Sequence, residues 1–564
     1  LVSRAVHLLC EKQVSPRQLT AVTFTNKAAR EMRERLTAEL DKDRTIGDLT
    51  IGTFHSICLS LLRETGKAVT LLSQEDAQAV AADVLRQAEA KLPPAKLVQA
   101  VSRQKNGLPV PENVNAAFCE SYVARCRELD VLDFDDLLLE TLALFEAGEL
   151  PEEITQRFTY LLVDEFQDID ALQYRLVRAW TKGCKSLFAI GDPDQSIYGF
   201  RGADAACFDR LAEDIPGLRV VRLTQNYRST PEVLGCALPV IGHNPGGARS
   251  LLPNRGSGAP VRLAQAASSL AEGIFIAKEI NRMVGGMDML EAQEHFLKEG
   301  MTGKRSFRDI AVLYRTHHQA RILEKCFQQE GIPYIVSGRE EFLEDPLIQG
   351  SISFFCSLAE PDNPYYKKDA LKKLWDLEEN EISGSIYEEL KAKYQDRWKR
   401  EKPQKFMQSW IKDLEQEGNP KLQNLADMAI FYPDIRAFLD AVLLGEEGDL
   451  KRCGGKNISG DAVSLMTLHA SKGLEFPVVF MFGMEKGEIP LEREENPADI
   501  QEERRLFYVG MTRASEELFL TCAQEPSSFL DEIPETYTQR KTVGKQKRVQ
   551  TYEQLSLFDM APEK

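Results

Sequence analysis

The sequence lacks three features that would assign it to well-defined protein classes. Its 564 residues contain no run of about 18 apolar residues, so no membrane span is expected. Its eleven cysteines include no C-x-x-C pair, which argues against a zinc site and suits reduced cytosolic thiols. Lys and Arg (70) are outnumbered by Asp and Glu (87), giving a net charge of −17. The surface as a whole is not basic, although a local groove of Lys and Arg could still bind nucleic acid.

A phosphate-binding loop is also missing. Such a loop has the pattern G-x-x-x-x-G-K-[ST]. Four Gly-Lys pairs occur, and they begin at Gly66, Gly303, Gly455 and Gly544. The residues that follow them are Ala, Arg, Asn and Gln, respectively, and none is the Ser or Thr that the pattern requires. The chain therefore contains no segment of this pattern.

This absence matters because YLLVDEFQD (160–168) ends an apolar run in Asp164 and Glu165. Adjacent carboxylates at the end of a buried strand are costly unless a positive group faces them. In nucleotide hydrolases that group is Mg²⁺ on a triphosphate, with one acid holding the metal and the other activating water. A solvated strand end or a helix cap is an equally good interpretation of the pair alone.

Apolar runs that end in polar residues predict the fold class. The first set comprises residues 19–27, 160–168, 186–195 and 220–229. Such runs, separated by helical segments, indicate an α/β fold with a parallel sheet covered on both faces. Ligands bind beyond the carboxyl ends of such strands, where the polar residues fall. A second set predicts a second α/β domain, and it comprises residues 308–321, 462–484 and 517–523.

Two charged helical segments interrupt these domains as insertions would, and the length of the chain agrees with several domains. Their alternating Lys and Glu residues predict solvated helix faces. From residue 524 onward the periodicity is lost, which predicts a flexible tail. The expected ranges are 1–61 with 136–221 (first domain), 62–135 (its insertion), 222–344 with 456–523 (second domain), 345–455 (its insertion) and 524–564 (tail).

The segment GDPDQSIYGFR (191–201) carries the strongest local signal. Gln195 follows a predicted strand, where its side-chain amide could sense a γ-phosphate. Tyr198, Phe200 and Arg201 come next in a Gly-containing turn. Aromatic side chains exposed beside a phosphate site suit stacking on bases. The alternative is that the two aromatic residues pack beneath the loop.

Two further segments end predicted strands. TFTNKAAREMRERL (23–36) predicts a helix with Thr25 and Asn26 as capping candidates. The free N–H groups at its start could bind a backbone phosphate, and an ordinary capped core helix is the alternative. TFHS places Phe54 and His55 at another strand end, either for packing or for contact with a base.

Two arginines complete the set. Arg228 ends QNYR beside Tyr227, and Arg513 lies in EERRLFYVGMTRASEEL (502–518) of the second predicted domain. A phosphoryl-transfer transition state spreads negative charge over its oxygens, so cations supplied across a cleft accelerate the reaction strongly. The alternative, two ordinary surface arginines, is disfavoured by the surrounding motifs.

Nine motifs between residues 20 and 523 resemble, in order, those of the UvrD/PcrA/Rep-type superfamily 1A DNA helicases. They are VTFTNKAAREM, TFHS, DFDDLL, LLVDEFQD, GDPDQSIYGFRG, LTQNYRS, VLYRTHHQAR, LMTLHASKGLEFPVVF and EERRLFYVGMTRA. The resemblance implies two RecA-like parallel-sheet domains, each interrupted by a helical insertion. It also implies a cytoplasmic, nucleoid-associated translocase moving 3′ to 5′ on single-stranded DNA. Its expected cofactors are ATP and Mg²⁺, its substrates include 3′-tailed duplexes, and its role is repair or replication-fork processing.

The resemblance also implies roles for individual residues. Asp164 would hold Mg²⁺, Glu165 would polarise the attacking water, and Gln195 would link the γ-phosphate to DNA. The other expected nucleotide contacts are Tyr227 on adenine, Glu475 on the ribose, and Arg228 and Arg513 on the γ-phosphate. The residues expected along the DNA path are Thr25, Asn26, Phe54, His55, Tyr198, Phe200 and His469.

The chain departs from the family in several places. It begins with LVSRAVHLLC, which resembles the helix after the family's phosphate loop, so we expect that loop to be cut off and ATP hydrolysis by this chain to be severely impaired. Phe200 stands where many relatives have tryptophan, a change that preserves stacking. Both insertions look shorter than in the large bacterial members, and no nuclease signature follows residue 523.

The end of the chain contains QLSLF (554–558), which resembles the peptide that docks bacterial replication proteins on the sliding clamp. Its expected contacts are Gln554, Leu555, Leu557 and Phe558, and folding back as a final strand is the alternative. A rival to the helicase hypothesis is therefore a non-catalytic adaptor that binds DNA and the clamp. An RNA-directed motor fits the motifs less well.

Overall fold

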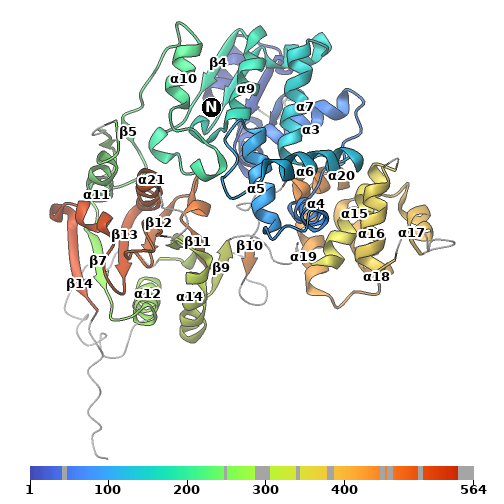
Figure 1. The fold of residues 1–564 in the computed structure, drawn as a ribbon. Coiled ribbons are helices and arrows are strands. Elements are labelled where there is room, and N and C mark those ends of the chain that lie inside the picture. Colours follow the sequence, from blue (N-terminus) through green and yellow to red (C-terminus); the bar gives the residue numbers. More distant parts are fainter. Residues whose placement is uncertain are drawn as a thin grey trace, which may run out of the picture. The chain divides into compact units, whose positions relative to one another are not determined.

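The computed structural model divides into two compact units, whose elements are labelled in Figure 1. Unit 1 comprises Leu1–Val220 and Gly338–Arg452, and unit 2 comprises Val221–Ser337 and Cys453–Lys564. The structure describes residues 1–40, 47–246, 250–285, 305–337, 343, 345–361, 363–377, 386–444, 451–453, 461–492 and 499–543. None of the described helices is both long and apolar enough to cross a membrane.

Unit 1 contains a four-stranded sheet with the order β2-β1-β3-β4, and all of its pairings are parallel. Its strands are β1 (Leu19–Val22), β2 (Thr50–Gly52), β3 (Tyr160–Val163) and β4 (Ser186–Ala189). The apolar runs that begin at residues 19, 160 and 186 are thus confirmed as strands. The polar residues that follow these strands lie at one edge of the sheet, as expected for parallel pairing.

Helices cover both faces of this sheet because alternate strand residues point to opposite sides. Ala21 and Leu162 pack with α1 (Val2–Val6) and α2 (Asn26–Glu39). Val22, Leu161 and Val163 pack on the other side, in a core shared by three helices. Those helices are α3 (Phe54–Glu64), α7 (Phe134–Ala147) and α9 (Ala171–Trp180). The α/β fold class predicted from the apolar runs is confirmed.

The rest of unit 1 is helical. The segment before α7 contains α4 (Gln74–Gln87), α5 (Pro94–Lys105) and α6 (Ala116–Glu128), and α8 (Glu152–Thr155) and α10 (Cys207–Asp214) lie further along. The segment from residue 345 contains α15 (Pro346–Ala359), α16 (Pro364–Trp375), α17 (Ile386–Tyr394), α18 (Pro403–Asp413), α19 (Pro420–Met428) and α20 (Ile435–Leu443).

Side chains fix this second helical segment to the first part of unit 1. Arg63 on α3 makes a bidentate contact with Asp440 on α20, with both Nη1–carboxylate distances at 2.9 Å. The Tyr366 hydroxyl accepts from the Leu71 N–H over 2.9 Å. The helical segment from residue 345 therefore packs against the first part of unit 1.

Unit 2 is built on an eight-stranded sheet with the order β10-β9-β11-β8-β12-β13-β7-β14. Its strands are β7 (Val261–Gln265), β8 (Ile310–Tyr314), β9 (Tyr334–Ser337), β10 (Lys451–Cys453), β11 (Val463–Thr467), β12 (Phe476–Met481), β13 (Ala514–Cys522) and β14 (Thr538–Thr542). Its helices are α11 (Pro231–Gly242), α12 (Ser269–Val284), α14 (His317–Glu330) and α21 (Ile500–Met511). The central strands β8, β11, β12 and β13 confirm the second set of apolar runs.

Two expectations need correction. The run 220–229 contains only a two-residue strand, β5 (Gln225–Asn226), paired with β6 (Leu252–Pro253). Val220 and Leu223 are 69% and 74% exposed, so their apolar character does not mark a buried strand here.

The tail was expected from residue 524, but β14 pairs with β7 in parallel register. Polar, exposed side chains on an edge strand leave no apolar signal in the sequence.

Candidate functional site

Asp164 and Glu165 follow β3 at the carboxyl edge of the unit 1 sheet. The Asp164 N–H donates to the Val22 carbonyl over 2.9 Å, which extends the pairing of β3 with β1 by one step. Glu165 has a left-handed backbone conformation, with φ 48° and ψ 42°. Such a conformation is uncommon for a residue with a side chain, and observed strain of this kind clusters at functional sites.

The acid pair carries negative charge that the surrounding groups balance poorly. Burial, followed by the charge of Glu165, raises the pKa of Asp164 from 3.8 to about 6. The Glu165 N–H, which donates to Asp164 Oδ1 over 3.1 Å, favours its ionised form. A divalent cation at this position would supply the positive charge that the pair requires.

The donor set fits Mg²⁺. Within the described part of the chain, no cluster of three or more His, Cys, Asp or Glu side chains is arranged to hold a metal. Mg²⁺ in nucleotide enzymes is commonly bound through one or two carboxylates together with phosphate oxygens and water. Two half-buried carboxylates at a strand end provide this kind of partial ligand set.

A hydrogen-bonded path joins the acid pair to the loop after β4. Gln167 Nε2 donates to Glu165 Oε2 over 2.5 Å, and Gln167 Oε1 accepts from the Asp192 N–H over 2.9 Å. Gln195 Nε2 in turn donates to Asp192 Oδ2 over 2.8 Å. The structure thus brings together Glu165 and Gln195, which were predicted from separate motifs.

Aromatic residues gather at the end of the same loop. Tyr198 stacks on Phe24 with ring centroids 5.0 Å apart, and Phe200 lies 6.0 Å from Tyr198. The Arg201 guanidinium lies over both loop rings, at 5.5 and 5.6 Å. Phe200 is 54% exposed. An exposed ring beside a guanidinium suits stacking on bases and attraction of a phosphate backbone.

The first predicted DNA segment lies next to this aromatic group, because Phe24 immediately precedes Thr25. The Thr25 side chain caps α2 by accepting from the Ala28 N–H over 3.1 Å, and Asn26 is the first helical residue. The structure therefore places Thr25 and Asn26 close to Tyr198.

Phe54 and His55 lie in different surroundings from Tyr198 and Phe200. Phe54 is only 4% exposed and stacks on Trp180 at 5.6 Å, so the packing alternative accounts for it in this structure. His55 meets the edge of Phe134 at 5.7 Å. Burial lowers the pKa of His55 to about 4, so the imidazole is neutral near pH 7 and offers hydrogen bonding without charge.

Unit 2 brings three of the predicted nucleotide contacts together. Arg228 Nε donates to Glu475 Oε2 over 2.7 Å. Arg513 is 1% exposed and donates to the carbonyl oxygens of Val509 (2.9 Å) and Leu474 (3.1 Å). Since Leu474 precedes Glu475, one short segment contacts both arginines. Tyr227, beside Arg228, is 69% exposed. His469 begins the turn His469–Ser471 and is half-buried.

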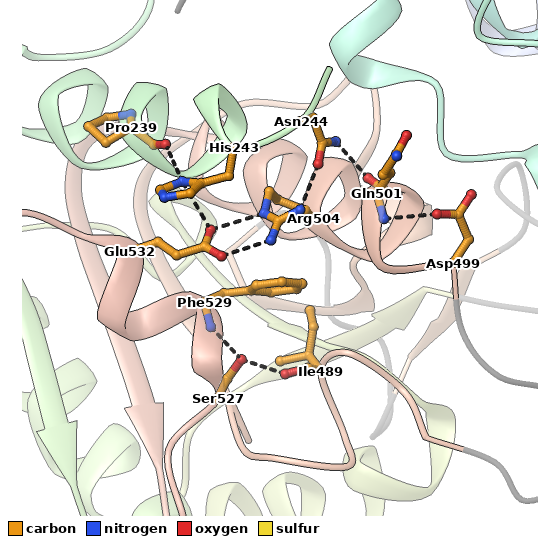
Figure 2. A network of polar contacts seen from close by, with 10 residues as sticks. All are labelled: Pro239, His243, Asn244, Ile489, Asp499, Gln501, Arg504, Ser527, Phe529 and Glu532. Carbon is orange, nitrogen blue, oxygen red and sulfur yellow. Dashed lines mark hydrogen bonds and ion pairs between the residues drawn. The ribbon is translucent and has the colours of Figure 1, made fainter. Parts of the chain in front are cut away.

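A polar network holds α21, the helix that precedes Arg513 (Figure 2). Arg504 on α21 makes a bidentate contact with Glu532, at 2.8 and 3.0 Å, and also donates to Asn244 Oδ1 over 2.7 Å. Phe529 lies beneath the Arg504 guanidinium, 5.1 Å from it. Asn244 comes just after α11, so the network fixes α21 against the helix that follows Tyr227 and Arg228. Mostly buried bidentate pairs of this kind hold geometry well.

The comparisons with known proteins agree with these motifs. The family model of the UvrD/REP helicase N-terminal domain matches residues 1–216, and that of the UvrD-like helicase C-terminal domain matches residues 221–402 and 365–525. The chain belongs to the UvrD/REP helicase family. The resemblance stated from the motifs is confirmed.

Individual relatives extend this match over most of the chain. ATP-dependent DNA helicase PcrA of Staphylococcus aureus (strain Mu50) is 30% identical over 655 residues, covering 98% of this chain and 84% of the relative. PcrA of Staphylococcus epidermidis (strain ATCC 35984) is 30% identical over 652 residues, covering 97% and 84%. A solved C-terminal domain of a possible DNA helicase from Lactobacillus matches with 10% identity and a TM-score of 0.24, over 56% of this chain and 98% of that chain. That likeness is too weak to inform the fold.

Two residues of the unit 1 site were not predicted from the sequence. Gln167 lies inside the quoted motif YLLVDEFQD, and its position two residues after Glu165 was the available signal. Phe24 lies in the apolar run before Thr25 and was counted as a strand residue. The clamp-like peptide with Gln554, Leu555, Leu557 and Phe558 lies outside the described residues.

Proposed function

We propose that this chain is an ATP-dependent DNA helicase that translocates 3′ to 5′ along single-stranded DNA in the cytoplasm, at the nucleoid. The observation that carries the proposal is the hydrogen-bonded path from Glu165 to Gln195, which joins an acid pair to a loop bearing exposed aromatic residues. The names of the PcrA relatives support the activity. The polarity and a role in repair or replication-fork processing rest on the family resemblance alone.

The unit 1 residues would act on the nucleotide as follows. Asp164 would hold Mg²⁺, which supplies positive charge to the phosphate oxygens when bound. Glu165 would orient the attacking water and accept its proton. Gln195 would sense the γ-phosphate and pass its position to the loop that carries Tyr198 and Phe200.

The unit 2 residues would recognise the rest of the nucleotide. Tyr227 would stack on the base, and Glu475 would accept from the ribose hydroxyls. Arg228 and Arg513 would stabilise the charge that develops on the γ-phosphate. The pre-formed contact between Arg228 and Glu475 supports this grouping.

Single-stranded DNA and 3′-tailed duplexes are the proposed substrates. Phe200 and Tyr198 would stack on bases, while the start of α2 at Asn26 would contact the backbone. His55 and His469 would contribute hydrogen bonds along the path. The 54% exposure of Phe200 supports its stacking role, whereas the buried ring of Phe54 would support the path from beneath.

The test is ATPase activity with and without single-stranded DNA. It is run on this chain and on a loop-bearing version, which carries the family's phosphate-loop segment ahead of Leu1. We expect DNA-stimulated turnover in the loop-bearing version and little in this chain, whose 564 residues contain no Gly-Lys pair followed by Ser or Thr. Glu165→Gln should lower kcat by about a hundredfold or more, as expected for loss of a general base.

A strand-separation assay on duplexes with a 3′ or a 5′ tail tests the polarity of the same proteins. Unwinding of the 3′-tailed duplex alone would support the proposal, and preference for the 5′ tail would refute the polarity. Full turnover by Glu165→Gln would refute the catalytic role of the acid pair.

A non-catalytic adaptor that binds DNA and the sliding clamp is the second candidate. If the loop-bearing version binds single-stranded DNA but hydrolyses no ATP, the adaptor hypothesis is preferred. Both candidates share a proposed partner, the bacterial sliding clamp. Pull-down of the clamp should be lost on Leu557→Ala with Phe558→Ala, and unchanged binding would remove the clamp from the proposal.

A further inference from the structure

We propose that Gln167 is a positioning residue that transmits movement of the DNA-contacting loop to the carboxylate of Glu165. The inference rests on the proposed function, since it assigns Glu165 to ATP hydrolysis and the loop 192–201 to DNA. In the proposed roles Gln167 touches neither DNA nor nucleotide. It contacts Glu165 and the segment that leads to Tyr198 and Phe200.

The position of Gln167 between the two segments carries the argument. Its side chain is fully buried, at 0% exposure. Nε2 donates to Glu165 Oε2 over 2.5 Å and to Asp168 Oδ2 over 3.1 Å, while Oε1 accepts from the Asp192 N–H over 2.9 Å. Both polar atoms of the amide are therefore engaged, and the side chain is enclosed by protein atoms.

A second hydrogen bond attaches the loop to Gln167 at another point. The Ser196 hydroxyl donates to the main-chain carbonyl oxygen of Gln167 over 3.0 Å. Gln167 thus holds both ends of the segment from Asp192 to Ser196, and the bond from Gln195 to Asp192 closes that segment on itself. The next residue, Ile197, is fully buried, and Tyr198 follows it. A shift of the aromatic group therefore acts on the main chain of Gln167 through Ser196 and on its side-chain amide through Asp192.

Gly191 shows how closely the two segments approach. A Cβ at this position would lie 2.1 Å from Gln167 Oε1 and 3.0 Å from the Phe166 N–H nitrogen. The first distance is shorter than a Cβ atom tolerates and the second is at the tight limit, so glycine permits the segment after β4 to approach the amide. The close approach makes the relay stiff, which transmission of a small displacement requires.

The chemistry of an amide suits this position. A neutral amide donates to Glu165 without neutralising it, so the charge of the acid pair remains available to a cation. A carboxylate at residue 167 would still accept from the Asp192 N–H but would repel Glu165 and Asp168. The Gln167→Glu variant therefore keeps the bond from the Asp192 N–H but loses the bond to Glu165.

The experiment compares Gln167→Leu with Gln173→Leu in the loop-bearing version. Gln173 is a second buried glutamine of unit 1, 8% exposed, and it serves as the matched control. We expect the ratio of ATPase activity with and without single-stranded DNA to fall about tenfold in Gln167→Leu, the scale of a modest coupling free energy. Gln173→Leu should keep full DNA stimulation. Melting temperatures of both variants distinguish loss of coupling from loss of folding.

The outcomes separate the two hypotheses. If the parent loop-bearing version shows no DNA-stimulated ATPase, the proposed function fails. Single-stranded DNA affinity of the original chain then tests Gln167 by itself: we expect affinity about threefold weaker for Gln167→Leu than for Gln173→Leu. Equal affinities would overturn the inference. If the parent is active, undiminished DNA stimulation in Gln167→Leu or in Gln167→Glu would overturn it.

Discussion

The two units carry opposite charges at their candidate nucleotide residues, and they balance these charges differently. In unit 1 the pKa of Asp164 stays raised, at about 6, although the backbone N–H of Glu165 donates to it. In unit 2 Arg513 donates to two carbonyl oxygens, and Arg228 is paired with Glu475. The acid pair is thus arranged to receive a cation, whereas the arginines are held in place before any ligand arrives.

The largest stability effect should come from Arg513. Arg513→Ala leaves the buried carbonyls of Val509 and Leu474 without their donors, which should destabilise unit 2 by about 3 kcal/mol. Glu165→Gln should change stability by less than about 1 kcal/mol, because it removes a poorly balanced charge. Calorimetric melting of both variants measures the contrast.

One melting result would contradict this difference in stability between Arg513→Ala and Glu165→Gln. Equal melting temperatures for Arg513→Ala and the parent chain would show that the arginine is not held by its carbonyl partners. Arg513→Lys serves as the control, because it keeps the charge but cannot form both bonds. We expect it to melt between the parent and Arg513→Ala.

Asp164 should make stability depend on pH. Its pKa is raised in the folded state from 3.8 to about 6, so the folded chain binds a proton more tightly than the unfolded chain. Its contribution to stability is therefore full below about pH 4 and is lost as pH rises through about 6. Asp164→Asn should be more stable than the parent near pH 8, by about 1–2 kcal/mol, and the difference should vanish near pH 4.

Added Mg²⁺ sharpens the same test. The cation should raise the melting temperature of the parent chain near pH 8, where Asp164 is ionised, and should leave Asp164→Asn unchanged. Equal shifts in both proteins would show that Mg²⁺ binds elsewhere. A parent chain that is already as stable as Asp164→Asn near pH 8 would contradict the charge imbalance in unit 1.

Buried strands were predictable from the sequence because their signal is local. The runs that became β3 and β12 are apolar along their whole length and pack in the sheet cores. The run 220–229 carries the same signal, but Val220 and Leu223 have no sheet around them in this structure. Strand β14 gave no signal because its exposed residues are polar. Apolar composition reports burial only where neighbouring strands are present to provide it.

The candidate site was predictable to the extent that function imposes unusual residues at strand ends. Asp164, Glu165 and Gln195 stand out because carboxylates and an amide follow apolar runs. Gln167 does not stand out, since its role depends on a contact with Asp192, 25 residues away. Phe54 looked like its exposed counterparts because a sequence motif does not report which side of a loop a ring faces.

The smallest stability effect should come from the exposed arginine of unit 2. The side chains of Arg228 and Glu475 are 34% and 63% exposed, so their 2.7 Å pair should contribute less than about 1 kcal/mol to folding. Arg228→Ala should therefore melt close to the parent while lowering kcat of the loop-bearing version by about a thousandfold, the scale of a cation on the transferred phosphoryl group. Glu475→Gln is the matched control, because it releases Arg228 without removing it and should reduce kcat far less. If Arg228→Ala and Glu475→Gln lose equal activity, ATP hydrolysis requires the intact ion pair and not only the positive charge of Arg228.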